Sequence, residues 1–210
     1  MAALGITSLV SVVAAVIDLW YADLIDRILG GVAAVPQSEI DAGDLVHGVS
    51  GIVETVTYLA AAVAFLVWLY RTRVNAEALA PHAHRHSRVW AVLGWVVPIV
   101  ALWFPKQVVD DVWDASARTP SPPKALFHAW WAAWLVSNWG AGLISRALFR
   151  AEEAEEYAAA ARFDVVSIGL SLIAAALAVP VVLRITQAQE RRREELAAGL
   201  HPAYTGYPWR

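Results

Sequence analysis

The sequence predicts an all-α integral membrane protein, because it combines three long apolar runs with a shortage of charged residues. Ile52–Tyr70 has 19 residues with one charged side chain, Ala125–Ser145 has 21 with none, and Phe163–Leu183 has 21 with one. An arginine closes each run. A hydrocarbon core about 30 Å thick needs about 20 helical residues. Charged residues make up 17 % of the chain, whereas soluble domains have about 25 %.

The remaining composition excludes several function classes. The formal net charge of -3 provides no bulk electrostatic attraction to nucleic acid. The absence of cysteine excludes disulfides, thiolate metal sites and cysteine nucleophiles. The first 17 residues contain no lysine or arginine, so a cleavable signal peptide is not expected. We therefore predict Leu4–Tyr21 as a first, uncleaved span.

Polar segments connect the predicted spans. Ala22–Val46 carries five acidic residues and one arginine and is predicted as a linker, with Ala22–Leu29 able to extend the first helix. Arg71–Arg88 is a basic stretch with four arginines and three histidines. Residues 1–185 are thus expected to form one transmembrane domain, followed by a charged cytoplasmic tail over residues 186–210.

A fourth apolar run, Val89–Phe104, is predicted to be broken. It has 16 residues, contains Pro98 and is closed by Pro105, and proline removes a backbone donor and kinks a helix. We expect a re-entrant or interfacial element here, with a membrane crossing as the alternative. Lys106–Ala115, which alternates valines with aspartates, is predicted as an amphipathic helix in the membrane interface.

The distribution of basic residues favours four spans plus the broken element over five spans. If Val89–Phe104 does not cross, 12 lysines and arginines lie on one side and 4 on the other; if it crosses, the split is 7 and 9. The positive-inside rule prefers the first arrangement. It places both termini in the cytoplasm of a multi-pass protein of the cell membrane.

One candidate site is an intramembrane pocket on two of the predicted spans. Trp131, Trp134 and Asn138 share a helix face at i, i+3 and i+7 and could line a pocket for a planar or lipidic ligand. A packed aromatic seam is the alternative. His47 and Glu54 share another face, two turns apart, where a proton relay or cation contact competes with a solvated pair at the membrane boundary.

The second candidate site is the basic stretch, whose cations would contact anionic lipid or a partner protein. Clustered bases beside a span attract anionic headgroups by about 1 kcal/mol each. The residues concerned are Arg71, Arg73, Arg85 and Arg88. The same region offers alternating histidines and the acidic motif Asp110-Asp111-x-x-Asp114, but both are better explained by solvated surfaces than by a metal site.

Two central segments resemble a known family. They are Phe65–Leu79, which contains Arg71-Thr-Arg73, and His86–Ile99, which contains Gly94-Trp95 and Pro98; Leu102–Val108 follows. Together they are similar to an actinobacterial membrane family catalogued as domain of unknown function 4328.

The resemblance covers roughly residues 45–185 and includes the Trp130-Trp131 pair. It implies a multi-pass membrane protein from a Gram-positive lineage, and it supplies no activity and no catalytic residue.

Two functions follow as hypotheses. The first is a non-enzymatic membrane protein that binds membrane lipids, a protein partner or a second copy of itself, with no metal or other cofactor. The second is a small membrane enzyme or cofactor protein that uses His47, Glu54, Asn138 and the tryptophans. A transporter subunit is a weaker alternative, since broken helices expose backbone to substrate in transporters. No complete catalytic set is visible in the sequence, which favours the first hypothesis.

Overall fold

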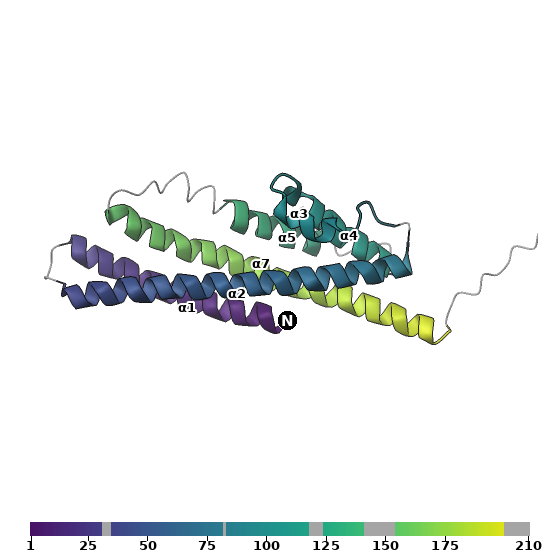
Figure 1. Ribbon diagram of the computed structural model, residues 1–210, viewed down its shortest axis with the longest axis horizontal. Helices are drawn as coiled ribbons and strands as arrows, with labels where there is room; N and C mark the ends of the chain where they lie inside the picture. The colour runs from purple at the N-terminus through teal and green to yellow at the C-terminus, as the bar shows by residue number, and fades with distance from the viewer. Residues whose placement is uncertain (31–34, 82, 118–123, 141–153, 200–210) are drawn as a thin grey trace, which may run out of the picture. The chain divides into compact units, whose positions relative to one another are not determined.

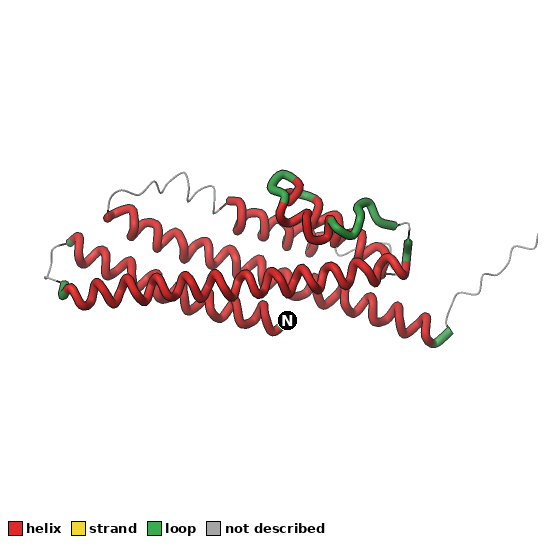
Figure 2. The backbone as a smooth tube through the Cα atoms, in the orientation of Figure 1, coloured by secondary structure: helices red, strands yellow, loops and turns green. Residues whose placement is uncertain are grey.

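The structure is a computed structural model that describes residues 1–30, 35–81, 83–117, 124–140 and 154–199. Every regular element in these ranges is helical (Figures 1 and 2). The elements are α1 (Ala2–Leu29), α2 (Gln37–Leu79), α3 (Trp90–Val96), the 3-10 turn η1 (Val100–Leu102), α4 (Phe104–Ser116), α5 (Lys124–Leu135), the π turn η2 (Val136–Gly140) and α7 (Ala154–Ala197). The all-α prediction is confirmed for these residues.

Three of the described helices, α1, α2 and α7, are long and apolar enough to cross a membrane. Few of the residues in their most apolar stretches are buried, as expected when lipid is the solvent; Ile52, for example, is 66 % exposed. With 43 residues, α2 is about 65 Å long at 1.5 Å per residue. Because this is twice the hydrocarbon thickness of about 30 Å, the polar parts of α2 extend beyond the membrane.

The long helices are more continuous than the predicted segments. Helix α1 continues through Ala22–Leu29. Helix α7 contains the last predicted span and continues into the predicted charged tail as far as Ala197. The predicted span Ala125–Ser145 corresponds to α5 and η2 as far as Gly140, and its last five residues lie outside the described part.

The chain divides into two compact units. Unit 1 comprises Met1–Phe65 and His128–Val179, and unit 2 comprises Leu66–Phe127 and Pro180–Arg210. In unit 1, α1 and α2 pack closely: the hydroxyl of Thr7 donates to the carbonyl of Thr57 at 2.9 Å. Gly43 approaches Leu24 so closely that a Cβ atom would collide with that side chain.

In unit 2, one buried side chain connects three helices. Gln189 of α7 is 4 % exposed. Its amide nitrogen donates to the carbonyl of Thr72 in α2 at 2.8 Å and to the hydroxyl of Ser116 in α4 at 3.1 Å. The side-chain amide of Asn75 donates back to the Gln189 carbonyl oxygen at 3.3 Å. The ends of α2, α4 and α7 are therefore held together.

The predicted amphipathic helix exists as α4, but its apolar face packs against protein. Val108, Val109 and Val112 are at most 1 % exposed. We expected this face to meet the membrane interface; Ser116 of the same helix is instead bonded to Gln189 within unit 2. The sequence pattern identified the apolar face, but it cannot distinguish lipid from protein as the covering surface.

The element before α4 is broken at Pro98, as predicted. Val97 precedes the proline and is extended (φ -77, ψ 112), because the ring of Pro98 disfavours helical backbone there. Helix α3 has seven residues and is about 10 Å long. It packs against the start of α4, since a Cβ on Gly94 would lie 3.4 Å from the Cβ of Phe104.

The burial of α4 gives a stability prediction. Val112→Ala should lower the free energy of unfolding by about 1–3 kcal/mol, the usual range for truncating a buried aliphatic side chain. Val96→Ala is the matched control, because Val96 is 68 % exposed. Thermal unfolding of the purified protein in detergent measures both. Equal midpoints for the two variants would mean that α4 does not belong to the core.

Candidate functional site

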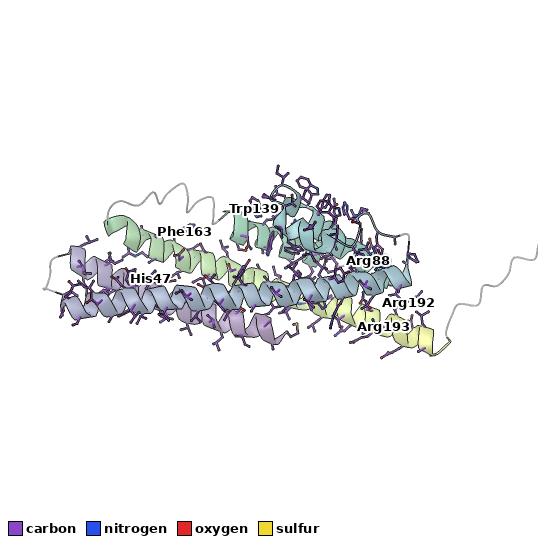
Figure 3. The ribbon with its side chains drawn as sticks, viewed as in Figure 1. His47, Arg88, Trp139, Phe163, Arg192 and Arg193 are labelled. Carbon is purple, nitrogen blue, oxygen red and sulfur yellow. The ribbon has the colours of Figure 1, made fainter. Side chains whose placement is uncertain are left out.

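Unit 1 brings an aspartate of α1 close to a histidine of α2. Asp18 of α1 is 6 % exposed, and its Oδ1 atom lies 3.2 Å from Nδ1 of His47 in α2. The His47 ring stacks on Tyr21 with 4.3 Å between ring centroids and 3° between planes. The Tyr21 hydroxyl donates to Asp44 at 2.8 Å. Figure 3 labels His47 on α2.

The structure places His47 with Asp18, whereas the sequence singled out Glu54 on the same helix face. Two residues seven apart on a helix are separated by about 10 Å along its axis, which is too far for an ion pair, whereas α1 lies directly alongside. The described residues contain no group of three or more His, Asp or Glu side chains arranged to hold a metal ion.

The tryptophan face of α5 and η2 makes ring and hydrogen-bond contacts within unit 1, with Trp131 buried and Asn138 exposed. The rings of Trp131 and Trp134 stack, with centroids 4.9 Å apart and planes at 13°. The hydroxyl of Tyr58 donates to the Asn138 side-chain oxygen at 2.7 Å, and the Asn138 amide donates to the carbonyl of Trp134 at 3.0 Å. Trp130 lies 6.1 Å from Phe65 between ring centroids. Trp131, Trp134 and Asn138 thus stack on or hydrogen-bond to other protein groups, and a ligand pocket at this face stays a prediction.

Three of the four candidate arginines in the basic stretch are engaged in ion pairs. Arg73 is 1 % exposed; it pairs with Glu77 at 2.9 Å and donates to the carbonyl of His86 at 2.8 Å. Glu77 also pairs with Arg88. A buried guanidinium is costly unless it is paired, so these contacts serve the fold.

Arg85 is the third engaged arginine, and it fastens the loop before α3 to α4. Its side-chain Nε and its backbone N–H donate to the two carboxylate oxygens of Asp111 at 2.7 and 2.9 Å. In the same loop, His86 Nε2 lies 2.6 Å from the side-chain oxygen of Gln107 in α4. Asp110 pairs with Lys106 at 2.6 Å. Two carboxylates of the Asp110-Asp111-x-x-Asp114 motif therefore have structural partners.

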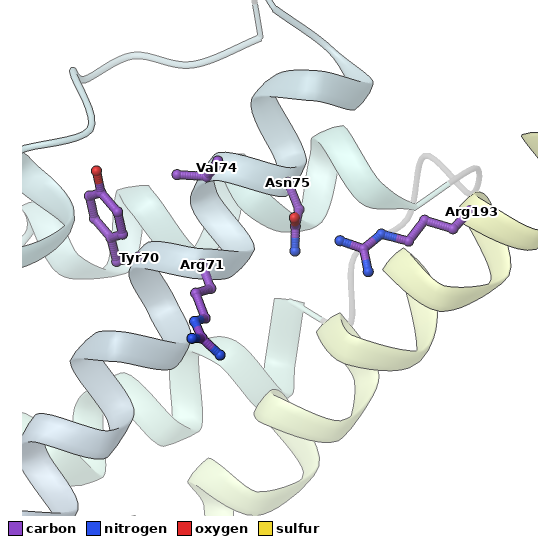
Figure 4. A pocket seen from close by; sticks show the side chains of 5 residues that line it. All are labelled: Tyr70, Arg71, Val74, Asn75 and Arg193. Atoms are coloured by element: carbon purple, nitrogen blue, oxygen red, sulfur yellow. The ribbon is translucent and has the colours of Figure 1, made fainter.

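Arg71, the fourth candidate, is exposed and lines a pocket. The cavity has a volume of about 490 Å³ and is formed by Tyr70, Arg71, Val74 and Asn75 of α2 together with Arg193 of α7 (Figure 4). Across the ranges that the structure describes, neither Arg71 nor Arg193 forms an ion pair.

Sequence reasoning missed Arg193 as a site residue. We had assigned it to a charged helical tail after the last span, and the run Arg191-Arg192-Arg193 does lie on the helix α7 that continues from that span (Figure 3). The absence of proline and glycine between Pro180 and Arg193 was the available signal, because nothing in that stretch ends a helix.

His84 gives a prediction about pH. Both of its ring nitrogens are shielded from solvent, and burial, together with the nearby charge of Arg73, lowers the pKa of His84 below its ordinary value. The folded protein therefore favours the neutral ring. The resulting stability is fully present above the unfolded-state pKa of about 6.5 and is lost as the pH falls through the lower folded-state pKa.

The thermal midpoint of the native protein should thus fall between pH 7 and pH 5 by more than that of His84→Gln. The control is His128→Gln, which removes an exposed histidine and should keep the native slope. If His84→Gln shows the same pH dependence as the native protein, His84 is not the titrating group.

Comparison with known proteins identifies the family. No curated protein and no solved structure matches the chain. The family model described as "Domain of unknown function (DUF4328)" matches residues 32–187, which include all of α2 and the pocket residues of that helix. Because the match covers most of the sequence, the chain belongs to the DUF4328 family.

Proposed function

We propose that the protein is a non-enzymatic, multi-pass membrane protein that binds anionic lipid headgroups at the Arg71–Arg193 pocket. One observation carries this proposal: in the described chain, these two arginines line one cavity and have no acidic partner. The fold uses Arg73, Arg85 and Arg88 in ion pairs. Of the four arginines in the basic stretch, Arg71 is the one left available for a ligand.

The position of the pocket along α2 supports a lipid ligand. Arg71 follows directly after the apolar run Ile52–Tyr70, at the depth where a membrane helix meets the headgroups. Tyr70, the last residue of that run, lines the pocket, and tyrosine favours the same depth. Cations there gain about 1 kcal/mol each from an anionic membrane surface.

We further propose four spans plus the broken element, with both termini in the cytoplasm. Contacts within unit 2 support this count. Thr72 of α2 bonds to Gln189 of α7, and Trp68 donates to Thr186 at 3.2 Å. Both helices thus leave the membrane on the same side, so the chain between them crosses an even number of times. The runs 125–145 and 163–183 supply two crossings.

If Val89–Phe104 also crossed, the chain between α2 and α7 would cross the membrane three times. The hydrogen-bonded ends of α2 and α7 would then lie on opposite sides of the membrane. The short helix α3 supports the same conclusion, because about 10 Å does not span the hydrocarbon core. The split of 12 and 4 basic residues then places the pocket on the cytoplasmic face of the cell membrane.

Single cysteines test the topology, since the native chain has none. Ser38→Cys, at the start of α2, should react with a membrane-impermeant maleimide on intact cells, and Ala197→Cys, at the end of α7, should react only after permeabilisation. Both positions are exposed. Labelling of Ala197→Cys on intact cells would rule out four spans.

Arg71→Gln tests the lipid proposal. The purified protein, titrated with phosphatidylglycerol in detergent and examined by native mass spectrometry, should lose about fivefold in affinity, because about 1 kcal/mol corresponds to that factor. Arg88→Gln is the control, since it removes the same charge from a side chain paired with Glu77. Undiminished lipid binding by Arg71→Gln would refute the proposed site.

A further inference from the structure

We propose that the Arg71–Arg193 pocket is specific for a phosphate monoester headgroup carried by a membrane lipid. This inference rests on the proposed lipid-binding function and goes further by naming the headgroup class. Its basis is that two guanidinium groups from different helices line one cavity. Figure 4 shows both side chains extending from α2 and α7 into the space between those helices.

The charge of the pocket is unbalanced. Arg192, the neighbour of Arg193, lies 3.5 Å from Glu195, and the buried Arg73 lies 2.9 Å from Glu77. Within the described residues, Arg71 and Arg193 have no such carboxylate, and no acidic side chain lines their cavity. Two positive charges without a counter-charge in one cavity favour an anionic ligand.

The two arginine charges favour a doubly charged phosphate monoester over a singly charged phosphodiester. A phosphate monoester carries about -1.5 to -2 charges at pH 7 and three free oxygens. Each guanidinium can form two parallel hydrogen bonds to phosphate oxygens, so two arginines can use all three oxygens and neutralise both charges. A phosphodiester has one charge and two free oxygens, so it leaves one arginine without a full partner.

The apolar part of the pocket argues for a lipid rather than free phosphate. Tyr70 and Val74 supply apolar surface beside the arginines, and this surface continues into the apolar run of α2. A volume of about 490 Å³ is within the range of pockets that hold small organic molecules and greatly exceeds one phosphate group. A glycerol-linked phosphate places its charge at the arginines and its chains toward the membrane.

The test compares headgroups on the full-length protein in detergent at pH 7.5, with native mass spectrometry as the readout. The probes are dioleoyl phosphatidic acid, a monoester, and dioleoyl phosphatidylglycerol, an anionic diester; inorganic phosphate is a third probe. We expect phosphatidic acid to bind about tenfold more tightly than phosphatidylglycerol, and this preference to shrink as the pH falls below the second phosphate pKa of about 6.

Variants of Arg193 test whether the pocket causes the preference for phosphatidic acid. Arg193→Gln should reduce it to about twofold or less, whereas Arg191→Gln, the same change on an exposed residue outside the pocket, should preserve it. Arg193→Lys keeps the charge without the planar fork, so it should bind both lipids and lose most of the discrimination. Thermal midpoints equal to that of the native protein show that each variant is folded.

Three results would overturn the inference. Equal binding of the two lipids, lost together in Arg71→Gln, would leave the lipid-binding function standing and remove the monoester specificity. Displacement of phosphatidic acid by an equal concentration of inorganic phosphate would make free phosphate the ligand. Binding of neither anionic lipid would refute the specificity and the proposed function together.

Discussion

The arrangement of unit 2 depends on satisfying one buried amide. Gln189 of α7 is buried, and burying an amide without hydrogen bonds costs several kcal/mol. Its amide nitrogen donates hydrogen bonds to Thr72 and Ser116, and its carbonyl oxygen accepts one from the amide of Asn75. The requirement to pair this amide brings α2, α4 and α7 together at one level.

The position of α4 also determines the ion pairs of the loop before α3. With α4 held by Ser116, Asp111 on the same helix is buried and must find a cation, and Arg85 supplies it. Arg73 and Arg88 share Glu77 for the same reason. Acidic and basic groups are thus matched around the loop. The same contacts set the register of α2 against α7, on which the proposed even number of crossings depends.

The parts of the fold that depend on length and local composition could be predicted from the sequence. The long apolar runs and the break at Pro98 are of this kind, since membrane thickness and proline geometry act on a few consecutive residues. The partner of His47 could not be predicted. A helix face can be derived from spacing, but the group opposite it, Asp18, belongs to another helix whose rotation and depth are set by packing.

Tertiary structure also decided which candidate charges remained available. The sequence alone does not distinguish the four arginines of the basic stretch. In the structure, Arg85 pairs with Asp111 of α4, and Arg73 and Arg88 pair with Glu77. A charge used by the fold is less available to a ligand, because its ion pair must first break; for Arg85 this would leave the buried Asp111 without a cation. A charge without such a partner must be balanced by solvent, ions or a ligand. Within the basic stretch this reasoning separates Arg71 from Arg73, Arg85 and Arg88, and the shared pocket then associates Arg71 with Arg193.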